Sequence, residues 1–201
     1  VERRGAAGLA GNTTTHYDFI TPEYQVFDSQ QPVKWECTRG IGRSFGFNRT
    51  ECGSDYLNGA QIIDMLVRIV SRGGNLLLNI GPRADGTVPY EQVKPLLETG
   101  EWLRVNGEAI YGTRPHSTLE YKDADGCSVC MTKTRDALYA IALRPDMPAS
   151  YEVKGLMLEE NAHVELLGAG EVQWFAEEDC TVFNLPENLP KKAAYTLKIH
   201  R

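Results

Sequence analysis

The sequence has 201 residues, of which 42% are hydrophobic and 24% are charged, as in an ordinary globular protein. Its net charge of -6 lacks the basic excess that phosphate binding requires, so we expect no nucleic-acid partner. No apolar run reaches the roughly 18 residues of a membrane-spanning helix, so we expect no membrane insertion. Val1 rather than Met at the start indicates a processed, trimmed or cut end, and the sequence assigns no compartment.

The cysteines and histidines do not form a recognisable metal-binding pattern. Five cysteines occur, and only Cys127 and Cys130 are spaced as a C-x-x-C pair. No second pair or nearby histidine completes a zinc set, so we expect reduced thiols in the core. The four histidines are scattered along the sequence, which argues against a histidine metal cluster. We therefore predict no metal and no cofactor.

Residues 1–113 alternate between helical and strand-like patterns. Apolar residues recur at helical spacing over residues 60–72, and a pair of glycines follows as a helix stop. The short apolar run 75–80 is what a parallel strand covered on both faces requires. A second helix is expected over about residues 90–105. Helix, strand and helix joined by short connections predict βα units and a parallel sheet.

From residue 114 onward the pattern becomes all-β, with short apolar runs separated by turn sequences. The predicted strands are 119–121, 127–133, 137–143, 151–153, 164–167, 172–175, 181–185 and 195–199. Their lengths and spacing predict a small antiparallel β-sandwich over 114–201. We therefore predict two domains, an α/β domain over 1–113 followed by this sandwich. A complete (β/α)8 barrel needs about 250 residues, so a barrel here would be partial and would leave sheet edges exposed.

Carboxylates, arginines and aromatic rings are concentrated in two adjoining runs. Residues 18–24 read Asp-Phe-Ile-Thr-Pro-Glu-Tyr, and residues 34–48 read Lys-Trp-Glu-Cys-Thr-Arg-Gly-Ile-Gly-Arg-Ser-Phe-Gly-Phe-Asn. Parallel sheets build active sites in the loops at the carboxyl ends of their strands. Carboxylates and arginine suit sugar hydroxyls, and aromatic rings suit the apolar face of a sugar. On composition alone, a solvated charged loop with aromatics in the core is the simpler interpretation.

Three long runs carry a specific family resemblance. They are residues 34–48, residues 69–89 (Ile-Val-Ser-Arg-Gly-Gly-Asn-Leu-Leu-Leu-Asn-Ile-Gly-Pro-Arg-Ala-Asp-Gly-Thr-Val-Pro) and residues 100–113 (Gly-Glu-Trp-Leu-Arg-Val-Asn-Gly-Glu-Ala-Ile-Tyr-Gly-Thr). In order and spacing they resemble α-L-fucosidases of glycoside hydrolase family 29. The resemblance implies a (β/α)8-type catalytic barrel followed by a C-terminal β-sandwich. It also implies retaining hydrolysis of terminal α-L-fucose from a fucosylated glycan, through a covalent glycosyl-enzyme intermediate.

The resemblance assigns roles to three positions. Glu23 matches the family's acid/base, which must enter the first step protonated and therefore needs a raised pKa. Arg3 matches an arginine that assists the site, with Arg4 as the alternative match. Phe45 matches an aromatic residue that packs on the methyl group of fucose, which would leave Phe47 structural.

The resemblance leaves the catalytic pair incomplete, because the family nucleophile is an Asp on a preceding strand that no run here resembles. Glu36 is the alternative acid/base, although an ordinary strand residue paired with Arg39 or Lys34 is the simpler interpretation. Glu23 could instead cap a helix. We therefore expect a fucosidase that acts as a homo-oligomer or with a complementary N-terminal half. The alternative is a fucose-binding or assembly protein without turnover.

Overall fold

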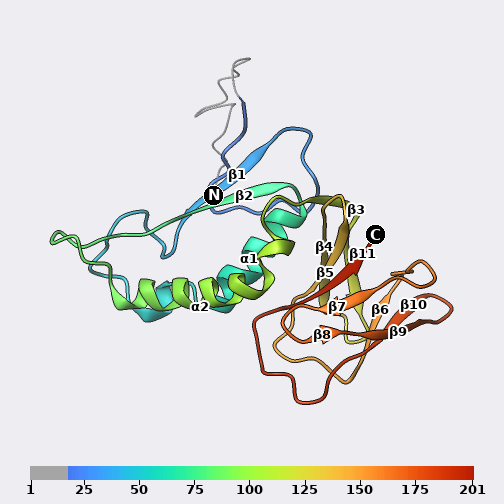
Figure 1. Ribbon diagram of the computed structural model, residues 1–201. Coiled ribbons are helices and arrows are strands. Elements are labelled where there is room, and N and C mark those ends of the chain that lie inside the picture. The colour runs from blue at the N-terminus through green and yellow to red at the C-terminus, as the bar shows by residue number, and fades with distance from the viewer. Residues whose placement is uncertain (1–17) are drawn as a thin grey trace. The chain divides into compact units, whose positions relative to one another are not determined.

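The structure is a computed structural model that describes residues 18–201 (Figure 1). It divides into two compact units, the N-terminal unit up to Gly100 and the C-terminal unit from Glu101 to Arg201. The division falls within helix α2 (Tyr90–Asn106), so residues of this helix belong to both units. No helix among the described residues is long and apolar enough to cross a bilayer.

The helices and strands follow the predicted order. Before α2 come β1 (Trp35–Gly40), a short 3-10 helix (Gly53–Asp55), α1 (Gly59–Ser71) and β2 (Gly74–Asn79). After α2 come a second 3-10 helix (Gly107–Ala109) and the strands β3 (Arg114–Asp123), β4 (Ser128–Lys133), β5 (Ala137–Ala142), β6 (Ser150–Lys154), β7 (Val164–Leu166), β8 (Gly170–Glu171), β9 (Gln173–Ala176), β10 (Cys180–Asn184) and β11 (Tyr195–His200). Both predicted helices and the predicted strand between them are confirmed to within two residues.

The N-terminal unit is built on a parallel sheet. β1 and β2 pair in parallel along their whole length, and α1 connects them as a βαβ unit. A third extended segment lies along the other edge of β1, where Ile20 bridges to Trp35 and Glu23 bridges to Thr38, again in parallel. Pro22, between the two bridges, has no N–H to donate, so this segment does not form a full ladder. The parallel sheet expected from the sequence is therefore present, whereas its membership of a (β/α)8 barrel stays a prediction.

Helix α1 covers one face of this sheet. The buried residues of the resulting core are Phe27, Trp35, Cys37, Met65 and Ile69. Phe27 lies edge-on to Trp35, with their ring centroids 4.8 Å apart. Gly74 lies opposite Trp35 in the sheet, and a Cβ atom there would come within 2.4 Å of the indole ring. Only glycine therefore lets this large ring lie flat against the start of β2.

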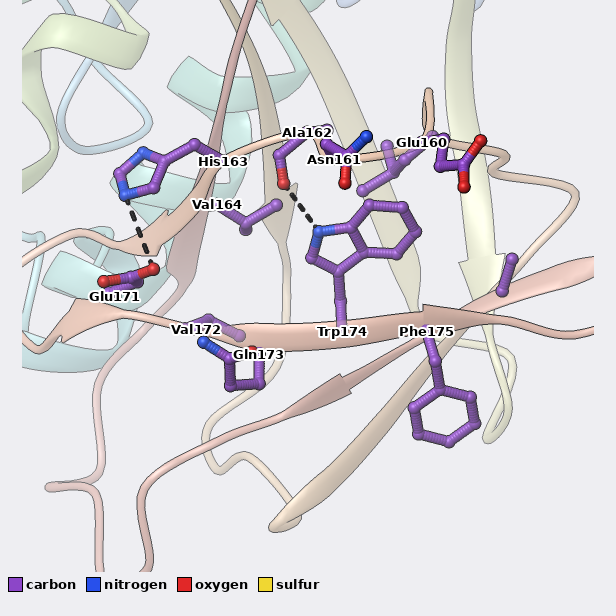
Figure 2. Close-up of a pocket in the computed structure, with 12 residues that line it drawn as sticks. Glu160, Asn161, Ala162, His163, Val164, Glu171, Val172, Gln173, Trp174 and Phe175 are labelled. Carbon is purple, nitrogen blue, oxygen red and sulfur yellow. Dashed lines mark hydrogen bonds and ion pairs between the residues drawn. The ribbon is translucent and has the colours of Figure 1, made fainter.

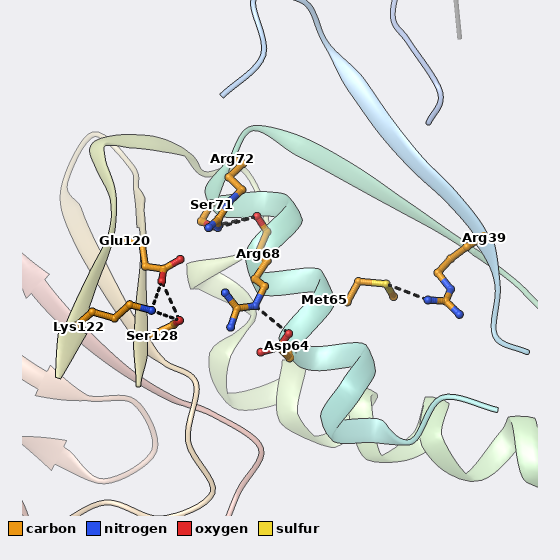
Figure 3. A network of polar contacts seen from close by, with 9 residues as sticks. All are labelled: Arg39, Asp64, Met65, Arg68, Ser71, Arg72, Glu120, Lys122 and Ser128. Carbon is orange, nitrogen blue, oxygen red and sulfur yellow. Dashed lines mark hydrogen bonds and ion pairs between the residues drawn. The ribbon is translucent and has the colours of Figure 1, made fainter. Parts of the chain in front are cut away.

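Local chemistry sets the ends of α1. Asn58 and Gln61 form a reciprocal capping box, in which each side chain accepts a hydrogen bond from the other's backbone N–H, both at 2.9 Å. The helix ends before Gly73, whose φ of 79° is easily adopted by glycine. Along the last turns, the Arg68 guanidinium donates to the Asp64 carboxylate at 3.0 Å (Figure 3). The capping box and Gly73 thus set where the helix begins and ends.

The C-terminal unit contains one continuous antiparallel sheet, in the order β8-β7-β11-β5-β4-β3-β6-β10-β9. β3 joins the two halves, because it pairs with β4 on one edge and with β6, through Lys122 and Asp123, on the other. Its pairing with β4 shifts register between Pro115 and Glu120, and such bulges bend a strand. Antiparallel pairing is as predicted, but the expected sandwich of two sheets is a single hydrogen-bonded sheet bent around one core.

That core takes side chains from both halves of the sheet. Its buried residues include Val129, Met131, Leu138, Ala140, Tyr151, Val153, Val164, Leu166, Phe183, Leu197 and Ile199. The Arg144 guanidinium reaches the buried Asp123 carboxylate at 2.8 Å, so that buried charge is paired. All five cysteines are free thiols, and burial raises the pKa of the Cys37 thiol.

Candidate active site

Glu23 lies on the face of the parallel sheet that is opposite α1. It bridges to Thr38 of β1, and Thr38 in turn pairs with Leu77 of β2. Side chains of paired residues point to the same face of a sheet, and successive pairs alternate between the two faces. The Trp35–Gly74 pair faces α1, so the Thr38–Leu77 pair, three residues later, faces away from it. Glu23, Thr38 and Leu77 therefore form one row across the sheet, two residues before the carboxyl ends of β1 and β2. Leu77 is 51% exposed on this face.

Glu36 lies one row earlier on the same face, nearer the amino end of β1. The pairing with Arg39 suggested by the sequence is not what the structure shows. Arg39 donates to the Gly40 carbonyl at 3.0 Å, and its guanidinium lies 4.9 Å from the centre of the Tyr24 ring. Both candidate acids thus share one face, and Glu23 is the one nearer the carboxyl ends, where parallel sheets place active sites.

Tyr24 connects the candidate acid to the loop after β1. Its φ of 52° turns the chain immediately after Glu23. The Tyr24 hydroxyl accepts from the Gly40 N–H at 3.1 Å and donates to the Arg43 carbonyl at 3.2 Å. Its ring meets Phe45 edge-on, with centroids 5.4 Å apart. These long-range bonds could not be predicted from the sequence, although a tyrosine directly after the candidate acid was a usable signal.

The loop after β1 presents two phenylalanines to solvent. Phe45 is 38% exposed and Phe47 is 37% exposed, so exposure does not separate a substrate-facing ring from a structural one. Their neighbours differ, because Phe45 contacts the Tyr24 ring whereas Phe47 lies 5.7 Å from the Arg83 guanidinium. The structure therefore places Phe45, rather than Phe47, beside the residue that follows Glu23.

Polar side chains fix the loops at this end of the sheet. The Ser44 N–H donates to the Glu51 carboxylate at 2.7 Å, which closes the loop after β1. Asn79, the last residue of β2, donates its amide N–H to the Phe45 carbonyl. After β2, the buried Gln92 side chain bonds both the N–H and the carbonyl of Gly81, at 2.8 and 3.3 Å. The loop that carries Phe45 is thus held to the end of β2.

Asp85 stabilises the turn after β2. Its carboxylate accepts from the Thr87 hydroxyl at 2.7 Å and from the Thr87 N–H at 2.9 Å. The hydroxyl bond and the N–H bond together lower the pKa of Asp85. The remaining predicted site residue, Arg3, lies outside the described residues, as does its alternative Arg4.

Carboxylates and exposed aromatic rings at the carboxyl ends of parallel strands are typical of glycoside hydrolases. The family model described as alpha-L-fucosidase matches residues 6–108. Human tissue alpha-L-fucosidase is 34% identical over 173 residues, which cover 83% of this chain and 37% of that protein. The alpha-L-fucosidase of Dictyostelium discoideum is 47% identical over 85 residues, or 42% of this chain and 18% of that protein.

Solved structures agree with these sequence matches. The Thermotoga maritima alpha-fucosidase bound to a mechanism-based inhibitor has a TM-score of 0.86 and 34% identity, over 94% of this chain and 44% of that one. The same enzyme in complex with fucose gives a TM-score of 0.83 and 34% identity, over 92% of this chain and 43% of that one. The chain belongs to the α-L-fucosidase family. The matched part is less than half the length of each of these relatives.

Proposed function

We propose that this chain is the C-terminal part of a retaining α-L-fucosidase and that Glu23 supplies the acid/base group. Residues 1–113 would then form part of a (β/α)8 catalytic barrel, and residues 114–201 would form the β-domain that follows it. The observation that carries the proposal is the position of Glu23, near the carboxyl ends of three parallel segments and beside the Tyr24–Phe45 ring pair. Its substrate class is a fucosylated glycan, because the similar T. maritima enzyme binds fucose.

Retention needs a second carboxylate, about 5–5.5 Å from the first, as the nucleophile. The family resemblance places that nucleophile on a strand that precedes the segments of this chain. Glu23 would first give its proton to the glycosidic oxygen while the nucleophile attacks the anomeric carbon. It would then take a proton from the water that hydrolyses the fucosyl-enzyme. This chain therefore contributes the proton-transfer half of the mechanism.

Phe45 is the residue we propose for the methyl group of fucose. Its ring is partly exposed, and Tyr24 supports it from one side. The Tyr24 hydroxyl bonds the backbone on either side of the turn after β1, so its ring cannot swing away without breaking two hydrogen bonds. An apolar ring held in this way suits a methyl group on a sugar that is otherwise polar. Arg3 remains the proposed additional contact from the family resemblance.

We also propose that a complementary N-terminal half, or a second copy, covers the face that carries Glu23. Leu77 is 51% exposed in the same row as Glu23, and burying it would remove apolar surface from water. The segment that contains Ile20 and Glu23 pairs with β1 and lies at the opposite edge of the sheet from β2. Open sheet edges can pair with further strands. Fucose binding without turnover is the alternative function if no second carboxylate joins the site.

The test is hydrolysis of an aryl α-L-fucoside by this chain, alone and combined with an N-terminal half from the same family. We expect turnover only in the combination, and a loss of about 10²–10⁴-fold in Glu23→Gln for substrates with poor leaving groups. Azide should restore the rate of this variant on an activated substrate and form α-L-fucosyl azide, because azide attacks the fucosyl-enzyme without needing a base.

Glu36→Gln is the matched control, since Glu36 lies on the same face one row away. Full activity of Glu23→Gln together with a large loss in Glu36→Gln would transfer the acid/base role to Glu36. Fucose binding by the combination without any hydrolysis would favour the binding protein over the enzyme.

A further inference from the structure

Two histidines and a carboxylate meet on the outer face of the C-terminal sheet. His163 directly precedes β7, Glu165 lies within β7, and His200 ends the neighbouring strand β11. The backbone N–H of His200 donates to the His163 carbonyl at 2.9 Å, which sets the two histidines opposite each other. Their neighbours Val164 and Ile199 are buried in the core. Because side chains alternate along a strand, both imidazoles and the Glu165 carboxylate point away from that core.

The geometry of the three side chains suits a metal ion. One ligand atom from each residue lies within 4.8 Å of the others. The His200 Nε2 atom is 2.5 Å from the Glu165 Oε1 atom, and the two imidazole rings have centroids 4.6 Å apart. Imidazole nitrogens and carboxylate oxygens are the ligands of zinc sites, and two histidines with one glutamate are a known set for an open site.

The charges around the cluster also favour a cation. Glu171 of β8 lies opposite Glu165, and its Oε1 atom is 3.9 Å from the His163 Nε2 atom (Figure 2). Lys198 also lies beside the cluster, and its Nζ atom is 2.8 Å from Glu108 but 4.0 Å from Glu165. Lys198 is thus held mainly by Glu108. Two carboxylates remain beside the histidines, and a divalent ion would neutralise them.

One member of the cluster, His163, lines a pocket of about 590 Å³. His163 and Glu171 line one end of this pocket, and Figure 2 shows their side chains pointing toward each other. Trp174 lines the pocket farther along β9, where its indole N–H donates to the Ala162 carbonyl at 2.7 Å. A water molecule at this end of the pocket would therefore lie beside His163 and Glu171.

We propose that His163, Glu165 and His200 bind a divalent transition-metal ion, with zinc as the best match to this ligand set. The ion takes the place of the hydrogen bond between His200 and Glu165. Glu171 or a water from the pocket completes its coordination. Because the ligands come from β7 and β11, the ion ties these two strands together on the outer face of the sheet.

The experiment is titration of the complete 201-residue chain with Zn²⁺ in a calorimeter, after removal of bound metal with a chelator. We expect one ion per chain, and a loss of affinity of about tenfold or more, or about 1.4 kcal/mol, in either His163→Asn or His200→Asn. His116→Asn is the matched control, because His116 lies on β3 and takes no part in the cluster. Equal affinity in the wild type and in a His163→Asn/His200→Asn double variant would overturn the proposal.

Two further measurements separate this site from other zinc ligands and from misfolding. The absorption spectrum of the Co²⁺-substituted protein distinguishes the ligands. Co²⁺ bound by nitrogen and oxygen absorbs in the visible range without a thiolate charge-transfer band. Such a band in the near ultraviolet would assign the metal to cysteines and overturn the proposal. Because Zn²⁺ would bind only the folded state, it should raise the melting temperature of the wild type. It should do the same for Lys198→Gln, because this variant keeps all three ligands. A variant that lacks either histidine should gain a smaller rise in melting temperature from the same Zn²⁺ concentration, because its affinity is lower.

Discussion

The two units bury their sheets in different ways. In the C-terminal unit, nine strands bend around a core in which Met131 and Phe183 are fully buried. In the N-terminal unit, α1 covers one face of a short parallel sheet, while Leu77 on the other face is 51% exposed. The C-terminal unit therefore has its own complete core. The N-terminal unit carries the candidate catalytic residue on this more open face, which we propose that a partner segment covers.

The largest expected effect tests whether the C-terminal core is self-sufficient. Phe183→Ala removes a fully buried ring and should destabilise this unit by about 3–5 kcal/mol. Peptide-resolved hydrogen exchange measures the loss for each unit separately. Phe175→Ala, on the neighbouring strand β9 but 46% exposed, should change stability by about 0.5 kcal/mol or less. Equal losses in the two variants would show that the core does not hold this unit together.

A second substitution tests the exposed face of the N-terminal unit. Leu77→Ala should cost about 0.5 kcal/mol or less in this chain, because the side chain is largely exposed. In a complex with the complementary N-terminal half, the same change should cost about 2–5 kcal/mol, because the side chain would then be buried. Chemical denaturation of both forms measures the difference. Leu97→Ala, 62% exposed on α2, is the control that should cost little in both forms. A small cost for Leu77→Ala in both forms would mean that this face stays uncovered.

The covered face should respond to overpacking. Gly74→Ala places a Cβ atom 2.4 Å from the Trp35 ring and should cost about 1–3 kcal/mol. Gly100→Ala, within α2, meets nothing within 4 Å and should instead stabilise the helix by about 0.5–1 kcal/mol. Thermal unfolding compares the two variants, which make the same chemical change. A neutral Gly74→Ala would indicate that the Trp35 ring is free to move aside.

Local patterns predicted most of the secondary structure, because their causes are local. The helix α1 is bounded by a capping box at Asn58 and by Gly73, and both signals are readable from a few adjacent residues. The strands of the C-terminal unit likewise follow from short apolar runs between turns. Their assembly into one sheet does not, because it depends on β3 pairing on both edges. Strand partners are a long-range property that no single window of sequence contains.

The same reason limits what could be predicted of the sites. Glu23 and Phe45 were assigned by family resemblance, whereas the hydroxyl bonds of Tyr24 to the next loop depend on where that loop returns. His163 and His200 look scattered in the sequence, yet the antiparallel register of β7 and β11 brings them together. Their meeting could be inferred only once the two strands were known to be neighbours.

The smallest expected effect concerns an exposed ion pair of the C-terminal unit. Burial alone would raise the pKa of Glu108, but hydrogen bonds from Lys198 and Tyr139 outweigh it and lower that pKa overall. The hydrogen bond to Glu108 is also the main cause of the raised pKa of Lys198. Because the pKa of Glu108 is lower in the folded state, the ionised carboxylate stabilises the fold at pH values above its unfolded-state pKa of about 4.3. This stabilisation is lost as the pH falls through the lowered pKa of the folded state. Because the pKa of Lys198 is higher in the folded state, its charged ammonium stabilises the fold at pH values below its unfolded-state pKa of about 10.4. This stabilisation is lost as the pH rises through the raised pKa of the folded state.

Glu108→Gln should therefore cost most between about pH 5 and pH 10, and little in stronger acid or base. The cost should be about 0–1 kcal/mol, because the Glu108 side chain is 44% exposed and solvent screens the pair. Urea unfolding at a series of pH values measures it, with the exposed Glu178→Gln as the control for losing one negative charge. A cost that does not vary with pH would mean that shape rather than charge matters at this position. The charge of the Lys198–Glu108 pair would then add nothing measurable to the stability of the C-terminal unit.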